Sequence, residues 1–171
     1  LLVPLTYALA RRLFPDKKII ASLAAWIVAL YPMFVIYPLS LATENLFFVL
    51  LLSSLLALVI ASQEHEAPGG EDLARNRLIG FICRERWYLL AGILFGLTAL
   101  TRSVSLALAG IAVLWVWVVL RARRQAMIVF IGVVALTLPW MVRNTLLHGQ
   151  LTGIESALGY DLYVGYHPEG T

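Results

Sequence analysis

Long apolar runs alternate with short polar segments along the whole chain. The runs cover residues 1–14, 19–37, 46–62, 87–120 and 126–142. An α-helix rises 1.5 Å per residue, so about 20 apolar residues cross the ~30 Å hydrocarbon core of a bilayer. The pattern predicts an all-α fold: a polytopic transmembrane helical bundle of about six membrane segments. We treat residues 1–171 as a single unit, and its ends predict an internal fragment of a longer protein.

The run from Trp87 to Leu120 is the one that requires interpretation. As one helix it would be about 50 Å long, too long for a bilayer even when tilted. Arginines flank both of its ends, which places both ends on the same side. The run therefore predicts a hairpin with its tip near Thr101, Arg102 and Ser103. Elsewhere, Pro15 and Asp16 predict a tight turn after the first helix.

Polar segments define the connections and the helix ends. Residues 63–86 predict a cytoplasmic loop that contains a short amphipathic helix, because apolar residues alternate there with four arginines. Residues 144–171 predict an extracytoplasmic loop, with Pro139 and Trp140 at the outer end of the helix before it. Glu44 is expected in the first turn of the helix that covers 46–62, where a carboxylate suits the positive helix end.

The basic residues are distributed unequally between the two sides. Of the 13 Lys and Arg residues, all except Arg102 and Arg143 fall in three clusters on one side. Excess Lys and Arg marks cytoplasmic loops. The chain is therefore expected in the cell (inner) membrane as a multi-pass protein, with its basic loops cytoplasmic and residues 37–45 and 144–171 extracytoplasmic. The clusters are Arg11, Arg12, Lys17 and Lys18; Arg75, Arg77, Arg84 and Arg86; and Arg121, Arg123 and Arg124.

Composition agrees with a membrane protein. The chain is 61% hydrophobic and only 13% charged, against about 25% charged in soluble domains. The net charge of +3 is compatible with nucleic acid as a partner, but the segregated basic clusters favour anionic membrane lipids. No nucleic-acid partner is expected. A lone cysteine excludes an internal disulfide, and neither a Walker-type loop nor zinc-ligand spacing is present.

Candidate binding residues gather on the predicted outer face. Arginine pairs bidentately with phosphate oxygens, so Glu44, Arg102, Arg143 and Asn144 predict a site for a lipid-linked phosphate. Each residue also has a structural interpretation: an arginine near a helix end extends to the headgroups, and Glu44 stabilises a helix start. Weaker candidates in the same region are Asn45, His148, Glu155, Asp161, His167 and Glu169. No metal site is predicted.

Three motifs resemble one enzyme family. "YPLSLATENLFFVLLL" at 37–52, "GLTALTRSVSLAL" at 96–108 and "LPWMVRNTLLHGQLTGIESALGYDLYVGYHPEG" at 138–170 resemble integral-membrane GT-C glycosyltransferases. The group they resemble is glycosyltransferase family 39, of the protein mannosyltransferase and aminoarabinose transferase type. The resemblance covers nearly the whole chain and rests on the order and sidedness of the motifs.

The resemblance implies a transferase that uses a polyprenyl-phosphate-linked sugar donor on the extracytoplasmic face. The acceptor would be a glycan, a lipid or a protein. The family's catalytic acidic pair lies in an external loop that would precede Leu1, so no catalytic residue is assigned here. A divalent metal, by the same resemblance, would bind to residues outside this chain. The fragment is expected to be inactive alone.

Two other interpretations have the same topology. A transporter or flippase would place polar groups at mid-depth in the membrane, but the centres of the spans at 19–30, 46–61 and 127–138 carry no charge. A non-catalytic membrane subunit of glycan assembly fits the pattern equally well. An acidic pair in the preceding external loop would favour the transferase over both alternatives.

Overall fold

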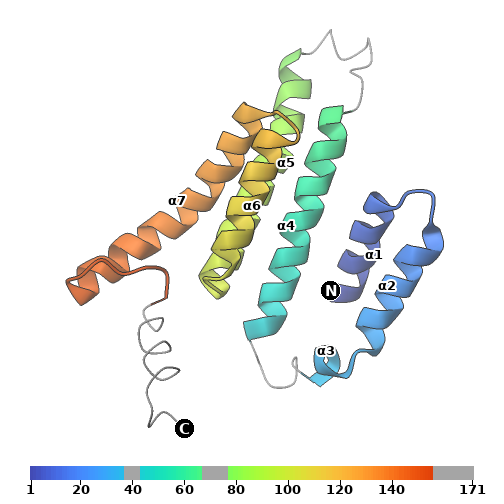
Figure 1. The fold of residues 1–171 in the computed structure, drawn as a ribbon, viewed down its shortest axis with the longest axis horizontal. Helices are drawn as coiled ribbons and strands as arrows, with labels where there is room; N and C mark the ends of the chain where they lie inside the picture. Colours follow the sequence, from blue (N-terminus) through green and yellow to red (C-terminus); the bar gives the residue numbers. More distant parts are fainter. Residues whose placement is uncertain (37–42, 67–76, 156–171) are drawn as a thin grey trace.

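The computed structural model describes residues 1–36, 43–66 and 77–155, and every element in these ranges is an α-helix (Figure 1). The predicted all-α fold is therefore confirmed for the described residues. The helices are α1 (Leu2–Leu13), α2 (Lys18–Leu30), α3 (Pro32–Ile36), α4 (Thr43–Glu66), α5 (Arg77–Thr101), α6 (Ser105–Val118) and α7 (Arg123–His148).

Helix α5 lies at the centre of the molecule. It packs against α4 and α7, and α6 packs against both α5 and α7. On the other side, α1 lies between α2 and α4 (Figure 1). Two hydrogen bonds join α1 to α4: the Arg12 guanidinium donates to the Gln63 side-chain oxygen at 3.0 Å, and the Gln63 amide donates to the Arg12 carbonyl at 2.8 Å. The bundle therefore consists of the α4–α7 group with the α1–α2 pair attached through α1.

Glycines allow α5 and α7 to approach closely. A Cβ atom on Gly92 would lie 2.5 Å from the carbonyl oxygen of Val129, and one on Gly132 would lie 3.0 Å from the backbone of Gly92. Gly96 comes one helical turn later and faces Val133 and Leu136 of α7. Gly92 and Gly96 have the small-xxx-small spacing that lets helix backbones meet in membranes. The close contact between α5 and α7 thus depends on the lack of a side chain at Gly92, Gly96 and Gly132.

The distribution of apolar side chains supports a membrane location. The core contains many small residues, such as Ala57, Ala61, Ala91 and Ala126. Many large apolar side chains face outward, for example Trp26, which is 63% exposed, although Tyr88 and Phe95 are buried. Two helical stretches are long and apolar enough to cross a membrane, Glu44–Glu64 and Arg123–His148, and only 28% and 33% of their spanning windows are buried in the protein.

The predicted hairpin is confirmed. α5 ends at Thr101 and α6 begins at Ser105, so the tip lies where the two flanking arginine clusters placed it. Backbone hydrogen bonds close the tip, from the Arg102 amide to the Thr98 carbonyl and from the Ser105 amide to the Arg102 carbonyl. The predicted turn after α1 is also confirmed, because α1 ends at Leu13 and α2 begins at Lys18.

The second predicted span is shorter than expected. The apolar run at 19–37 forms α2, which has 13 residues, and then the separate short helix α3. Tyr31 adopts an extended backbone with φ −70° and ψ 115°, the conformation that a residue before proline favours. Pro32 then starts α3, where its missing N–H is not needed. The prediction of one continuous span across residues 19–37 was therefore wrong.

Two predicted loop boundaries were also wrong. The loop at 63–86 is narrower, because α4 continues to Glu66 and α5 already begins at Arg77. The amphipathic stretch is thus the first part of α5 in the described residues rather than a separate helix; arginine is a good helix former, so polar sequence can extend a helix. Residues 67–76 lie outside the described residues.

The second boundary concerns α7. Pro139 and Trp140 do not mark its end, since the helix continues to His148, and the loop predicted from 144 begins only at Gly149. The left-handed conformation of Gly149 (φ 65°) ends the helix, and its amide donates to the Thr145 carbonyl. Only residues up to Glu155 of that loop are described. The total of about six membrane segments stays a prediction.

Candidate functional site

An ion pair joins α4 to the hairpin tip. The Arg102 guanidinium contacts the Glu44 carboxylate, which lies in the first turn of α4. The two side chains are 47% and 30% exposed, so the pair lies at the surface of the bundle end rather than in its core. Glu44 starts its helix, as capping and dipole arguments predict, and at the same time holds Arg102. Two of the four predicted binding residues therefore meet.

The segment after α7 is folded back onto that helix. The buried Asn144 amide nitrogen donates to the carbonyls of Gly153 (3.2 Å) and Ile154 (3.1 Å). The Trp140 indole N–H donates to the Ile154 carbonyl at 3.3 Å. These bonds direct the next residue, Glu155, to the hairpin tip, where its carboxylate accepts a hydrogen bond from the Ser103 hydroxyl at 2.6 Å.

A polar cavity opens at this junction. It has a volume of about 350 Å³ and is lined by Thr101, Arg102, Ser103, Val104 and Glu155. The cavity thus combines a guanidinium, two hydroxyl groups and a carboxylate. A guanidinium and hydroxyl donors can bind phosphate oxygens, while a carboxylate can accept hydrogen bonds from sugar hydroxyls.

Arg143 and Asn144 behave differently from the pair at the tip. The Arg143 guanidinium lies over the Trp140 ring, 4.8 Å from its centroid, and donates weakly to the Asn144 side-chain oxygen at 3.4 Å. It is exposed on the side of α7 and does not line the tip cavity. Asn144 uses its amide to hold the segment after α7. Its observed contacts are structural, and its predicted role in substrate binding stays a prediction.

The weaker sequence candidates have separate outcomes. Glu155 is the one that the structure brings to the tip; nothing in the sequence distinguished it from the other acidic residues of the predicted loop. Its position depends on Asn144 and Trp140, and such long-range tethers have no local sequence signal. Asn45 lines an apolar cavity beside α1 and α3. Asp161, His167 and Glu169 lie outside the described residues. Within the described residues, no group of three His, Cys, Asp or Glu residues could hold a metal ion.

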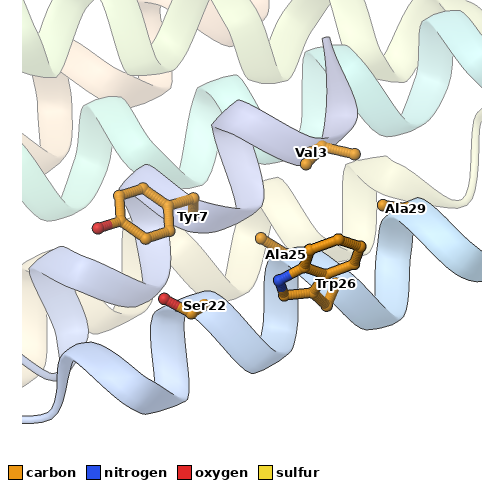
Figure 2. A pocket seen from close by; sticks show the side chains of 6 residues that line it. All are labelled: Val3, Tyr7, Ser22, Ala25, Trp26 and Ala29. Atoms are coloured by element: carbon orange, nitrogen blue, oxygen red, sulfur yellow. The ribbon is translucent and has the colours of Figure 1, made fainter.

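Another cavity lies between α1 and α2. It has a volume of about 260 Å³, and Figure 2 shows the six side chains that line it: Val3, Tyr7, Ser22, Ala25, Trp26 and Ala29. Its lining is mainly apolar, with one phenol and one hydroxyl group. These six side chains include no carboxylate, imidazole, amine or guanidinium, so the cavity offers less chemistry than the tip cavity.

Comparison with known proteins gives no family for the chain. No protein-family model, no curated protein and no solved structure matches it. Its function must therefore be argued from its own residues.

We expect Asn144→Ala to release the segment after α7. The buried side chain makes two hydrogen bonds to that segment, and removal would leave the Gly153 carbonyl without this donor and the Ile154 carbonyl with the Trp140 indole alone, at a cost of about 1–3 kcal/mol. Limited proteolysis in detergent should cut the variant faster near Leu151, which is 93% exposed. Thr152→Ala is a milder comparison, since its hydroxyl bonds only to the nearby Gln150 carbonyl. Equal cleavage rates for Asn144→Ala and the unaltered chain would contradict the tether.

Proposed function

We propose that this chain is part of a membrane glycosyltransferase that takes a sugar from a polyprenyl-phosphate donor at the extracytoplasmic surface. The observation that carries the proposal is the pairing of Arg102 with Glu44 beside a polar cavity at the tip of a short hairpin. An arginine that lies partly within the membrane normally pairs with a specific partner and marks a functional site. The order of the three family-like motifs in the sequence supports the same enzyme class.

The size and chemistry of the tip cavity support a phosphosugar ligand. Pockets for small ligands typically measure about 300–1,000 Å³, and this one measures about 350 Å³. Arg102 would bind the donor phosphate, with the hydroxyl groups of Thr101 and Ser103 as further donors. Glu155 would accept hydrogen bonds from hydroxyl groups of the sugar. The polyprenyl chain would remain in the surrounding lipid.

The interior of the bundle supports an end-of-bundle site over a transport path. Hydroxyl groups buried within the helices bond to carbonyls of their own helix: Ser54 to Leu51, Thr98 to Leu94, and Thr137 to Val133. These groups therefore have partners and do not form a polar binding site at mid-depth, where transporters bind their substrates. The charged side chains that could bind a substrate, Glu44 and Arg102, lie instead at the ends of α4 and α5.

The proposed reaction divides the work between this chain and residues outside it. An acceptor hydroxyl oxygen attacks the anomeric carbon, the bond from that carbon to the phosphate oxygen breaks, and the acceptor proton passes to a base. Arg102 would stabilise the negative charge that develops on the leaving phosphate, which is a main source of catalysis in such reactions. The base is expected in the family's external loop, outside these residues.

We expect Arg102→Gln to weaken binding of polyprenyl phosphate by about tenfold or more. A charge-assisted hydrogen bond contributes about 1.5–3 kcal/mol, and glutamine keeps a hydrogen-bond donor but is shorter and carries no charge. Native mass spectrometry of the purified chain in detergent would measure binding, with unphosphorylated polyprenol as the reference ligand. Arg143→Gln is the matched control at the same end of the bundle and should reduce binding less. Equal affinity for the phosphate and the alcohol would refute the proposal.

Glu44→Gln tests the same site in the opposite direction. The Glu44 carboxylate occupies the guanidinium of Arg102, so a phosphate must compete with it. Neutral glutamine is the weaker competitor, and affinity for polyprenyl phosphate should rise several-fold. A fall in affinity would mean that Glu44 positions Arg102 for the ligand rather than competing with it.

A further inference from the structure

The end of the bundle opposite the hairpin tip carries an exposed basic surface. The turn between α1 and α2 and the turn between α6 and α7 both lie at this end, with the end of α4 and the start of α5 between them (Figure 1). The two turns carry several exposed basic side chains. These are Arg12, Lys17 and Lys18 in the first turn and Arg121, Arg123 and Arg124 in the second.

Hydrogen bonds hold the first turn in one shape. The Arg11 guanidinium donates to the Pro15 carbonyl at 2.7 Å, and the Lys17 amide donates to the Phe14 carbonyl at 3.2 Å. The bonds between Arg12 and Gln63 fix the same turn to α4. Arginine side chains thus maintain the turn, and its two lysines extend from it into the surroundings.

The same turn exposes large apolar side chains next to its lysines. Leu13 is 52% exposed and Phe14 is 46% exposed. Lys17 and Lys18 do not stabilise α2, because a cation at the start of a helix lies at the positive end of the helix dipole. Apolar side chains flanked by cations suit the boundary between acyl chains and anionic headgroups. A soluble polyanion would leave Leu13 and Phe14 in water.

The second turn follows the end of α6 and includes a residue in the left-handed conformation. Arg121 has a positive φ of 52°, a conformation that is uncommon for residues other than glycine. Its neighbours Val118 and Val119 are exposed apolar residues. This turn therefore has the same combination of exposed cations and exposed apolar side chains as the first.

We infer that these two turns, Arg11–Lys18 and Val118–Arg124, form a binding surface for anionic phospholipid headgroups. Lys17, Lys18, Arg121 and Arg123 contact the phosphates. Leu13, Phe14, Val118 and Val119 enter the acyl region. Arg124 also pairs with Glu85 of α5 at 3.3 Å, so its charge is partly used within the protein. This inference rests on the membrane location in the proposed function but not on its sugar chemistry.

Native mass spectrometry would compare retention of phosphatidylglycerol and phosphatidylcholine by the purified chain. Phosphatidylglycerol should be retained at least severalfold more strongly. Each basic residue near an anionic surface contributes about a fivefold gain in affinity, so Lys17→Gln with Lys18→Gln should lower phosphatidylglycerol affinity by about 25-fold. Far-UV circular dichroism confirms that the double variant keeps its helices. Equal retention of the two lipids would overturn the inference.

Two further arms identify the source of the anion. Leu13→Ser with Phe14→Ser should weaken phosphatidylglycerol retention while leaving all the charges in place; unchanged retention would overturn the proposed apolar contact. Inorganic phosphate at millimolar concentration should fail to displace the lipid, and displacement would indicate a site for free anions instead. Loss of polyprenyl phosphate binding with retained phosphatidylglycerol selectivity would reject the proposed sugar chemistry alone.

Discussion

Gly92→Leu is expected to separate α5 from α7 and to abolish the native fold in detergent. Even the first side-chain carbon at this position would lie 2.5 Å from the Val129 carbonyl oxygen, well inside contact distance. That oxygen belongs to the backbone of α7 and cannot rotate away. Overpacking a close contact costs about 1–3 kcal/mol or more, and a leucine side chain requires the helices to move apart along their whole contact.

The matched control lies on α6. A Cβ atom on Gly110 would meet nothing within 4 Å, and Gly110 is exposed within its helix. Gly110→Leu should therefore leave stability unchanged or raise it, because leucine favours helix more than glycine does. Thermal unfolding in detergent, followed by circular dichroism, would measure both variants, with Gly92→Ala as an intermediate case. A Tm for Gly92→Leu equal to that of Gly110→Leu would show that the close contact does not hold the bundle together.

Local sequence signals located the features that depend on short stretches of chain. The hairpin tip at Arg102 followed from length and charge, because a bilayer limits helix length and arginines mark helix ends. The position of Glu44 in the first turn of α4 followed from helix electrostatics. In both cases the physical rule concerns the length of an apolar run or the charge at its ends, so the sequence alone was sufficient.

Other features depend on how helices meet and could not be found this way. The end of α2 at Leu30 is set by Tyr31 and Pro32, yet a proline inside an apolar run is also common within membrane helices. Pro139 has a similar sequence setting and does not end α7. After Pro139, Trp140 and Asn144 bond to the segment that follows α7, and such contacts between distant residues have no local sequence signal.

The candidate site divides in the same way. Charge and position predicted that Glu44 and Arg102 share one end of the bundle, and their ion pair is consistent with that prediction. Glu155 reaches the same cavity because the segment after α7 folds back. Arg143 lies six residues before Gly149, at the predicted end of the molecule, but stacks on Trp140 instead of entering the cavity. Side-chain packing decides between such positions, and composition does not.

Thiol labelling is expected to give an all-or-none difference between the two ends of the bundle. In a Cys83→Ser background, Leu151→Cys places a thiol at a residue that is 93% exposed beside the tip site. Asp16→Cys places one in the exposed turn between α1 and α2. Basic residues surround position 16 and resist translocation. Few arginines lie near position 151, so this barrier is weaker there.

An impermeant maleimide applied to intact cells should label position 151 and not position 16. Permeabilised cells should show labelling at both positions, which controls for reactivity and for the presence of the protein. The two ends of the helices that join these positions are separated by the length of the bundle, so no local movement exchanges them. Labelling of position 16 alone in intact cells would show that the orientation is the reverse of the predicted one. The Glu44–Arg102 pair would then lie on the cytoplasmic side. A lipid-linked donor on the extracytoplasmic face would then have no access to it.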